Sequence, residues 1–337
     1  MQAPLTDRLL RYWRSALGPE VRFQTTPLRL SGGFDTAIIA FRLIGAPDHL
    51  SGHLVLRLMS SETSPQRISR EAATHLALID RQFPVPRVIV AETDPAPLGG
   101  PFLIMERLVG SNMVQAAMER TGRLSHMIAM PRSLAKVQAL LHSIPGNALH
   151  EAAQKFDLEP DYFTIAAEVD RLTRRAEHAR LAGLRAGAAW LARNLPSPAE
   201  PTVICHGDFH PLNVVMDGET FSGVVDWAQA IVAEPACDVA ATRVVLLLSN
   251  LGEPSWARLP VEGLRKLGAS RYTAAYRSAR PFIDRNLPYF EAMRIFQALT
   301  VAGSAPPRSA GPWRAPRTLE RLLQRFEHIT GQRISLC

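Results

Sequence analysis

Short apolar runs alternate with polar positions along the first hundred residues, a pattern typical of strands in a half-buried sheet. Turn-forming Gly, Pro and Asp residues separate these runs, which predict strands over residues 28–30, 37–43, 53–59, 88–91 and 102–106. One segment has helical spacing instead, beginning at Pro65 and continuing through Ile68 and Leu78 to about Gln82. The pattern therefore predicts a small β-rich unit that contains one helix.

Beyond residue 112 the apolar spacing becomes helical, as at Leu134, Val137, Leu140 and Leu141. A long helical region is predicted from about 162 to 194, followed by a proline-rich linker, a polar hairpin, and further helices to the end of the chain. These include a short buried helix around 244–248. We expect an α+β, two-lobed chain, with a β-rich lobe over 1–108 and a mostly helical lobe over 109–337.

Composition changes this interpretation little. The chain has 337 residues, 47% hydrophobic and 20% charged, which is ordinary for a globular protein with a well-buried core. No run approaches the ~20 apolar residues of a membrane span, and the first residues lack a secretory pattern. Cys205, Cys237 and Cys337 are odd in number and widely spaced, which favours a reducing compartment over disulfides or a zinc site. We expect a cytoplasmic protein with no membrane association.

A formal net charge of +7 raises the question of nucleic-acid binding. The basic residues are spread along the chain rather than clustered, so a solvated basic surface explains them better. We expect no nucleic-acid partner, and no obligate protein partner is evident.

The chemistry concentrates in His206-Gly-Asp-Phe-His-Pro-Leu-Asn213, followed by Val-Val-Asp226-Trp. Each polar residue alone is most often a turn former or cap. Together they match a phosphoryl-transfer site, which needs one carboxylate facing the substrate hydroxyl and an amide oxygen and a second carboxylate facing Mg²⁺. The spacing predicts Asp208 as the base or hydroxyl-orienting residue, and Asn213 and Asp226 as the metal ligands.

The two histidines of this segment are expected to play different parts. His206 is expected to brace the loop through hydrogen bonds, with a role in proton transfer less favoured. His210 either faces the acceptor or packs within the loop.

These motifs, together with Glu234-Pro-Ala-Cys-Asp238-Val-Ala240, resemble the aminoglycoside phosphotransferase/choline kinase-type family of small-molecule kinases. The resemblance runs from about Leu28 to Ala240. It implies a protein-kinase-like fold, ATP as phosphoryl donor with GTP not excluded, Mg²⁺, and a hydroxyl of a small molecule as acceptor. It also implies that Asp238 anchors the catalytic loop. The D-F-G and A-P-E motifs of regulated protein kinases are absent from the sequence.

The same resemblance assigns the nucleotide-binding residues. Gly32 and Gly33 would lie in a loop that covers the phosphates, although a plain hairpin turn explains two glycines equally well. The backbone around Glu106 and Leu108 would hydrogen-bond the purine.

Members of the family usually carry a phosphate-binding lysine on the third strand, paired with an acid on the next helix. No lysine precedes Lys136 in this chain. Arg57 occupies the strand position and Glu71 is the natural partner, and a planar guanidinium is a sound phosphate ligand.

The acceptor is the least determined part of the prediction. After Ala240 acids are few among many arginines, namely Glu253, Glu262, Asp284, Glu291, Glu320 and Glu327. A neutral or anionic hydroxylated metabolite is therefore favoured over a cationic aminoglycoside. The missing lysine leaves one alternative, a nucleotide-binding pseudokinase that serves as an interaction module.

Overall fold

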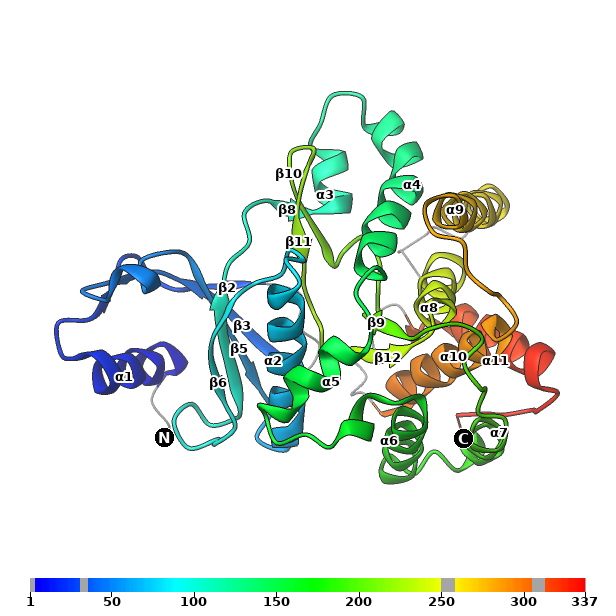
Figure 1. Cartoon of the computed structure of the whole chain (residues 1–337), viewed down its shortest axis with the longest axis horizontal. Helices are drawn as coiled ribbons and strands as arrows, with labels where there is room; N and C mark the ends of the chain where they lie inside the picture. Colours follow the sequence, from blue (N-terminus) through cyan, green and yellow to red (C-terminus); the bar gives the residue numbers. More distant parts are fainter. Residues whose placement is uncertain (1–3, 31–35, 250–257, 305–312, 337) are drawn as a thin grey trace.

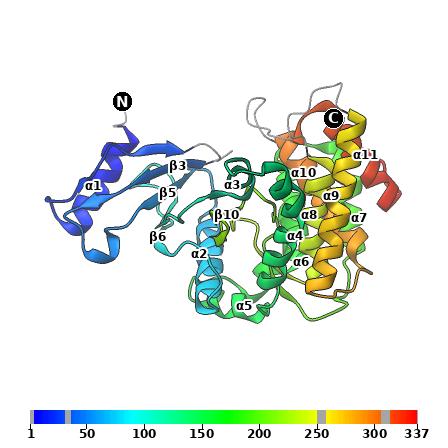
Figure 2. The ribbon, with the colours of Figure 1, turned by 90° about the horizontal axis from the view of Figure 1, so that it is seen from above.

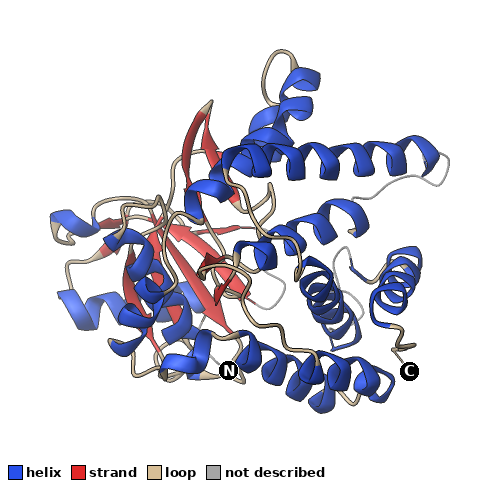
Figure 3. Ribbon diagram, turned by 45° about the vertical axis from the view of Figure 1, so that its right-hand side comes forward, coloured by secondary structure: helices blue, strands red, loops and turns tan. Residues whose placement is uncertain are grey.

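The computed structural model describes residues 4–30, 36–249, 258–304 and 313–336. Figure 1 shows two lobes, a sheet at one end of the molecule and a group of helices at the other. Coloured by secondary structure, the larger strands gather in one part of the chain and long helices form most of the rest (Figure 3). The α+β, two-lobed architecture predicted from the sequence is confirmed, with the physical basis described below.

The described residues of the N-terminal lobe form two helices, a 3₁₀ turn and seven strands. Their bounds are α1 (Leu5–Leu17), β1 (Arg22–Phe23), β2 (Leu28–Leu30), β3 (Thr36–Phe41), β4 (Leu43–Ile44), η1 (Asp48–Leu50), β5 (Leu54–Met59), α2 (Pro65–Asp80), β6 (Val88–Glu92) and β7 (Phe102–Glu106). Five of the strands form one antiparallel sheet in the order β2-β3-β5-β7-β6. All five predicted strands and the predicted helix are present, within a few residues at each end.

The first helix, α1, was not predicted. Its apolar residues Leu9 and Trp13 are four positions apart and both are buried against the sheet. Tyr12 adds an edge-to-face contact with Phe102 of β7. With Arg11 and Arg14 exposed on the opposite face, the helix is strongly amphipathic, and packing of its apolar face stabilises it.

The C-terminal lobe is mostly helical. Its elements are β8 (Ser111–Asn112), α3 (Met113–Met118), α4 (Arg123–Leu141), α5 (Asn147–Gln154), η2 (Pro160–Phe163), α6 (Ile165–His178), η3 (Ala182–Leu184), α7 (Arg185–Arg193), β9 (Val203–Cys205), β10 (Val214–Asp217), β11 (Thr220–Val224), β12 (Ile231–Ala233), α8 (Pro235–Leu248), α9 (Arg258–Ala279), α10 (Leu287–Ser304) and α11 (Pro316–Thr330). β8 pairs with β10 rather than with the N-terminal sheet, so the chain leaves that sheet just after β7.

Two expectations for this lobe need correction. The helical region predicted over 162–194 is divided into α6 and α7, because Arg180 has a left-handed φ of 57° that no continuous helix allows. The segment 244–248 is helical, but only Val244 is buried and the next four residues are partly exposed. No helix among the described residues is long and apolar enough to span a membrane.

Helix α2 lies between the sheet and the helical lobe in both Figure 1 and Figure 2. Its Arg70 is buried and reaches across to the other lobe, donating to the carbonyl of Ala230 at 2.7 Å and to Glu168 of α6 at 3.1 Å. A buried guanidinium with a carboxylate partner fixes geometry because neither group tolerates separation in a dry site. This contact therefore holds the two lobes in register around the loop that joins β9 to β10.

Candidate active site

The loop from His206 to Asn213 is fastened to the first turn of α8. The buried carboxylate of Asp238 accepts the backbone N–H of His206 at 2.9 Å and that of Gly207 at 2.8 Å. Gly207 has φ of 79°, and a Cβ at this position would lie 2.2 Å from the carbonyl oxygen of Gln229. Only glycine satisfies both constraints. Asp208 therefore follows directly after two residues whose backbone is held by Asp238 of α8.

A second buried residue, His142, supports Asp238 from the end of α4. Its Nε2 lies 3.2 Å from Asp238, and its Nδ1 contacts the hydroxyl of Tyr276. Burial opposes a charge on this ring, but the contacts with Asp238 and Cys205 outweigh burial and raise the pKa of His142 to about 9. Near neutral pH the pair is therefore an imidazolium and a carboxylate, both without solvent exposure.

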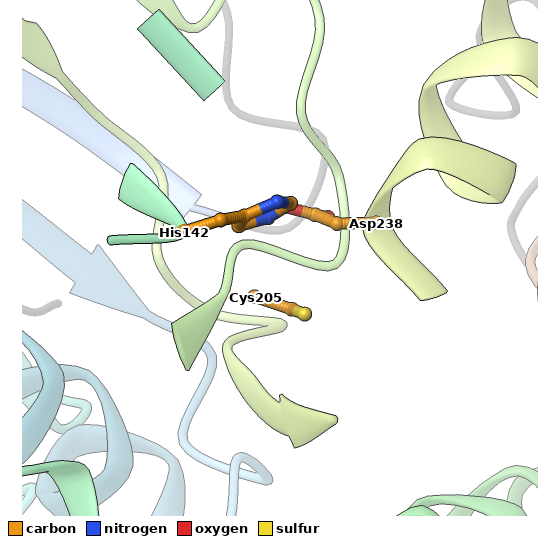
Figure 4. Close-up of side chains that lie close together, drawn as sticks. All are labelled: His142, Cys205 and Asp238. Carbon is orange, nitrogen blue, oxygen red and sulfur yellow. The ribbon is translucent and has the colours of Figure 1, made fainter. Parts of the chain in front are cut away.

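Figure 4 shows that His142, Cys205 and Asp238 lie close together, and these three residue types can bind metals. Both ring nitrogens of His142 are already engaged by Asp238 and Tyr276. Burial raises the pKa of the Cys205 thiol well above its usual range, which keeps it protonated. The cluster is therefore better described as a structural ion pair beside a neutral thiol than as a metal centre.

His206 braces the loop, as expected. Its Nε2 lies 3.0 Å from the carbonyl of Val225, and its Nδ1 accepts the backbone N–H of Asp208 at 3.2 Å. Burial lowers the pKa of His206, which agrees with a neutral ring that donates at Nε2 and accepts at Nδ1. The ring packs against Trp227 at a centroid distance of 4.5 Å. His206 thereby connects the loop of Asp208 to the turn that carries Asp226.

Asp208 is in direct contact with an arginine from a distant helix. Its Oδ1 accepts a short hydrogen bond from Nη2 of Arg294 in α10, and its Oδ2 lies 3.7 Å from Nε2 of His210. Burial alone would raise the pKa of Asp208, but Arg294 and His210 outweigh burial and hold that pKa well below its usual range. The carboxylate is therefore ionised, and one of its oxygens is occupied.

Asn213 and Asp226 face the same region from the two ends of the hairpin. The side-chain amide nitrogen of Asn213 donates to the backbone carbonyl of Asp208 at 3.0 Å. This contact directs the side-chain oxygen of Asn213 away from the loop. Asp226 has φ of 68°, an uncommon conformation for a non-glycine residue and one often found at functional sites. Nearly half of the Asp226 side chain is exposed. The pair offers a carboxylate and an amide oxygen, the ligand types that Mg²⁺ prefers.

Arg57 joins the N-terminal sheet to this region. From the middle of β5 it forms a short ion pair with Glu71 of α2 and donates to Asp226 at 3.0 Å. Burial opposes the charge, but Glu71 and Asp226 outweigh burial and raise the pKa of Arg57, so it remains a cation. The contact between Arg57 and Glu71 that the sequence predicts is present. Nε of Arg57 and Oε2 of Glu71 are buried without a partner among the described residues, so the pair retains one unused donor and one unused acceptor.

The remaining predicted nucleotide residues have mixed outcomes. Gly32 and Gly33 lie outside the described residues, so their role stays a prediction. The amide of Glu106 donates to the carbonyl of Arg87, which removes one of the donors that a purine could use. Leu108 lies in the connection after β7, with its side chain near Gly223.

Sequence reasoning missed the residues that approach Asp208 from outside the motif. Arg294, Gln229 and Gln297 form one polar group beside it. A signal was available, because α10 is buried almost throughout and a lone arginine in such a helix requires a partner. His142 was also missed, although it ends a helix of evident apolar spacing.

Three of the six acids after Ala240 are engaged by arginines or lysine. Glu262 contacts Lys266 and Arg321, and Glu291 contacts Arg243 and Arg325. Asp284 pairs with Arg277, and Glu253 lies outside the described residues. These three acids are therefore already paired with basic side chains and are not free to receive a polycation.

A model of the phosphotransferase enzyme family matches residues 30–282, which is 253 of the 337 residues. The chain belongs to this family. The match spans both lobes and includes the loop of Asp208 and the turn of Asp226. The resemblance noted in the sequence is thereby confirmed, and the chain is a member of a family of phosphotransferases.

Solved structures support the fold of this phosphotransferase. An aminoglycoside-3'-phosphotransferase of type VIII superposes with a TM-score of 0.58 at 18% identity, covering 87% of this chain and all of that one. A thermostable mutant of another aminoglycoside phosphotransferase, in ternary complex with ADP and hygromycin B, gives a TM-score of 0.51 at 13% identity, covering 96% of this chain and 95% of that one. At such identities the likeness shows the protein-kinase-like fold alone.

The curated relatives that this chain matches are named as acyl-CoA dehydrogenases rather than as phosphotransferases. The mouse protein "Acyl-CoA dehydrogenase family member 10" is 27% identical over 255 residues, covering 72% of this chain but 22% of that protein. The chain spans less than a third of the length of the first curated relatives that it matches. The activity of those longer proteins is therefore not transferred to this chain by similarity.

Proposed function

We propose that this phosphotransferase moves the γ-phosphoryl group of ATP to a hydroxyl of a neutral or anionic small molecule and requires Mg²⁺. The observation that carries the proposal is that one hydrogen-bond network joins the loop of Asp208 to the turn of Asp226: Asp238 accepts the amides of His206 and Gly207, and the His206 ring lies 3.0 Å from the carbonyl of Val225. In this proposal residues 1–108 bind the nucleotide and residues 109–337 supply the catalytic loop and the acceptor site.

On the nucleotide side, Arg57 would bind phosphate oxygens while Glu71 holds it in place. The spare Nε of Arg57 and the planar geometry of guanidinium suit a phosphate oxygen. Gly32 and Gly33 would cover the phosphates, and the backbone near Glu106 and Leu108 would contact the base. GTP remains an alternative donor, because no described side chain distinguishes the two purines.

On the metal side, Asp226 and Asn213 would hold Mg²⁺. The residues fit a hard cation, since both offer oxygen and the Asp226 carboxylate is the more exposed of the two. When bound, Mg²⁺ would neutralise charge on the phosphates. Asp226 also touches Arg57, so the metal-binding turn and the phosphate-binding arginine would move together.

On the acceptor side, Asp208 would orient the hydroxyl and receive its proton as the oxygen attacks the γ-phosphorus. The pairing of Glu262, Asp284 and Glu291 with basic residues supports a neutral or anionic acceptor over a polycationic one. Among anionic candidates, a hydroxylated acyl-CoA thioester is the first to test, because curated relatives are named as acyl-CoA dehydrogenases.

The test is a measurement of ADP release from Mg·ATP with a panel of hydroxyl acceptors, including hydroxy acids, hydroxylated acyl-CoA thioesters, sugars and aminoglycosides. We expect acceptor-dependent release that is lost when Mg²⁺ is chelated. Nucleotide binding without turnover on any acceptor would favour the pseudokinase alternative instead.

A further inference from the structure

Arg294 is in an unusual position for an arginine. It shares the buried helix α10 with a single other charged residue, Glu291, and only 6% of its side chain is exposed. Its Nη2 donates to Asp208, and its Nη1 donates to Gln297 at 2.6 Å and to Gln229 at 3.3 Å. A single carboxylate therefore balances its charge.

The surroundings of Arg294 leave binding capacity on the acceptor side. Its Nε is buried and has no hydrogen-bond partner among the described residues. A void of about 20 Å³ lies against Arg294, Gln229, Gln297 and the backbone of Gly207, which is room for a ligand oxygen rather than a whole molecule. The ring of Trp313 lies 5.4 Å from the guanidinium carbon and covers another face. The guanidinium is thus enclosed, and its Nε has no partner among the described residues beside a small void that is otherwise lined mainly by apolar side chains.

The contact with Asp208 constrains the reaction. A carboxylate that receives the hydroxyl proton becomes neutral, and Arg294 then loses the one carboxylate that it contacts in the described part of the chain. An unpaired buried charge is strongly destabilising. An acceptor that carries its own negative charge next to the hydroxyl would remove this penalty, whereas a cationic acceptor would increase it.

We propose that Arg294 is the specificity-determining residue of the acceptor site and binds an oxyanion, carboxylate or phosphate, that lies near the reacting hydroxyl. The proposal rests on the proposed function and names the substrate class, a hydroxylated acid. Without acceptor, Arg294 holds Asp208. With the acid bound, the guanidinium is shared between the acceptor anion and Asp208.

The reaction balances on these groups. The acceptor oxygen forms a bond to the γ-phosphorus, and its proton passes to Asp208. The bond between the γ-phosphorus and the bridging oxygen breaks, and ADP leaves with that electron pair. The positive charge of Arg294 is balanced throughout, first by Asp208 and then by the acceptor anion.

The experiment compares acceptors that differ only in charge. Glycerate, glycerol and aminopropanediol share a three-carbon frame with an anionic, a neutral and a cationic end. Each acid that proves to be a substrate in the acceptor panel is likewise compared with its neutral amide. ADP release is measured for the wild type, Arg294→Gln and Arg294→Lys. Arg243→Gln serves as a matched control, because Arg243 also pairs with a carboxylate of α10 but lies away from Asp208.

We expect Arg294→Gln to raise the KM for an acid acceptor by about 10- to 100-fold, the range for loss of a charge-assisted contact. The KM for the neutral analogue should change by no more than about threefold, so the preference for the acid collapses. Arg294→Lys should recover part of the preference for the acid, and Arg243→Gln should keep that preference in full. A merely structural role for Arg294 would lower turnover of the acid and the neutral analogue alike.

Two outcomes would overturn the inference while leaving the proposed function intact. One is turnover by the wild type of neutral or cationic acceptors but no acids, and the other is an unchanged acid preference in Arg294→Gln. Acceptor binding is also measured by thermal stabilisation, which requires no turnover and therefore still tests the inference if a variant is inactive. Thermal stabilisation of the wild-type protein by glycerate and longer hydroxy acids should exceed that by the neutral analogues, should be reduced in Arg294→Lys and should be absent in Arg294→Gln. Equal stabilisation by acids and neutral analogues contradicts the inference even if no acceptor is turned over.

Discussion

Two arginines, one from each lobe, contact the two carboxylates that we propose as catalytic, Asp226 and Asp208, and their environments differ. Arg57 comes from the N-terminal sheet and contacts two carboxylates, Glu71 and Asp226. Arg294 comes from the helical lobe and contacts one, Asp208, together with two neutral amides. The group of Arg57, Glu71 and Asp226 has two negative charges and one positive charge. The pair of Arg294 and Asp208 has one charge of each sign.

The difference explains which ligand each side can receive. Surplus negative charge beside the half-exposed Asp226 favours a cation, as the proposed binding of Mg²⁺ requires. The balanced group beside Asp208 has no net charge to attract a cation, and Nε of Arg294 has no partner among the described residues. The nucleotide side is therefore suited to a metal complex, and the acceptor side to a neutral or anionic hydroxyl compound.

The largest expected effect is on the acceptor side. Asp208→Asn should lower ADP release by ~10²–10⁴, because it removes the group that orients the hydroxyl and receives its proton. ATP affinity, measured by calorimetry, should change only a few-fold. Asp217→Asn, an exposed aspartate at the end of β10, is the matched control. Activity of Asp208→Asn within a few-fold of the wild type would remove Asp208 from the mechanism.

The next effect is on the metal side. Asp226→Ala should raise the Mg²⁺ concentration required for half-maximal activity more than Asn213→Ala does, because a carboxylate supplies a formal charge and an amide only a dipole. Asp226→Asn is a useful companion, since asparagine tolerates the left-handed backbone at this position. If Asp226→Ala has the metal dependence of the wild type, the assignment is wrong.

Breaking the pair on the nucleotide side should have an intermediate effect. Arg57→Ala should weaken ATP binding by roughly one to two decades, and Arg57→Lys should fall between the wild type and Ala because it keeps the charge but loses the fork. Glu71→Ala should weaken ATP binding less, since the arginine also contacts Asp226. A double-mutant cycle on ATP affinity measures the coupling. Additive effects within error would show that Glu71 does not orient Arg57 for the nucleotide.

The smallest expected effect is the pH dependence of stability. The pKa of His142 is about 9 in the folded protein, above the ~6.5 expected when unfolded. Its stabilisation is therefore complete below pH ~6.5 and is lost as pH rises through 9, on the order of 2 kcal/mol between pH 7 and 9. Thermal unfolding should shift down by a few degrees over this range. His142→Asn should be less stable at pH 7 and should lack this part of the pH dependence, and an unchanged slope would contradict a charged His142.

The sequence predicted those parts of the molecule that depend on local pattern. The strands of the N-terminal sheet follow from alternation, and the loop of Asp208 follows from residue spacing. The contacts of Arg57 with Asp226 and of Arg294 with Asp208 join residues 169 and 86 positions apart. The first contact forms only when the two lobes pack, and the second only when α10 packs against the catalytic loop within the helical lobe, so no local pattern indicates either. The break between α6 and α7 was missed for another reason, because a single left-handed residue leaves little trace in apolar periodicity.

The attachment of the catalytic loop to Asp238 has a consequence for how the protein moves. Loop amides usually exchange their hydrogens with water quickly, because small local openings expose them. The amides of His206 and Gly207 are bonded to a carboxylate that has no solvent access and is itself held by His142 of α4. Exchange there requires α8 to separate from the loop, an opening on the scale of the helical lobe. The catalytic loop should therefore exchange as slowly as the core helices around it, and thermal inactivation should coincide with the melting of that lobe.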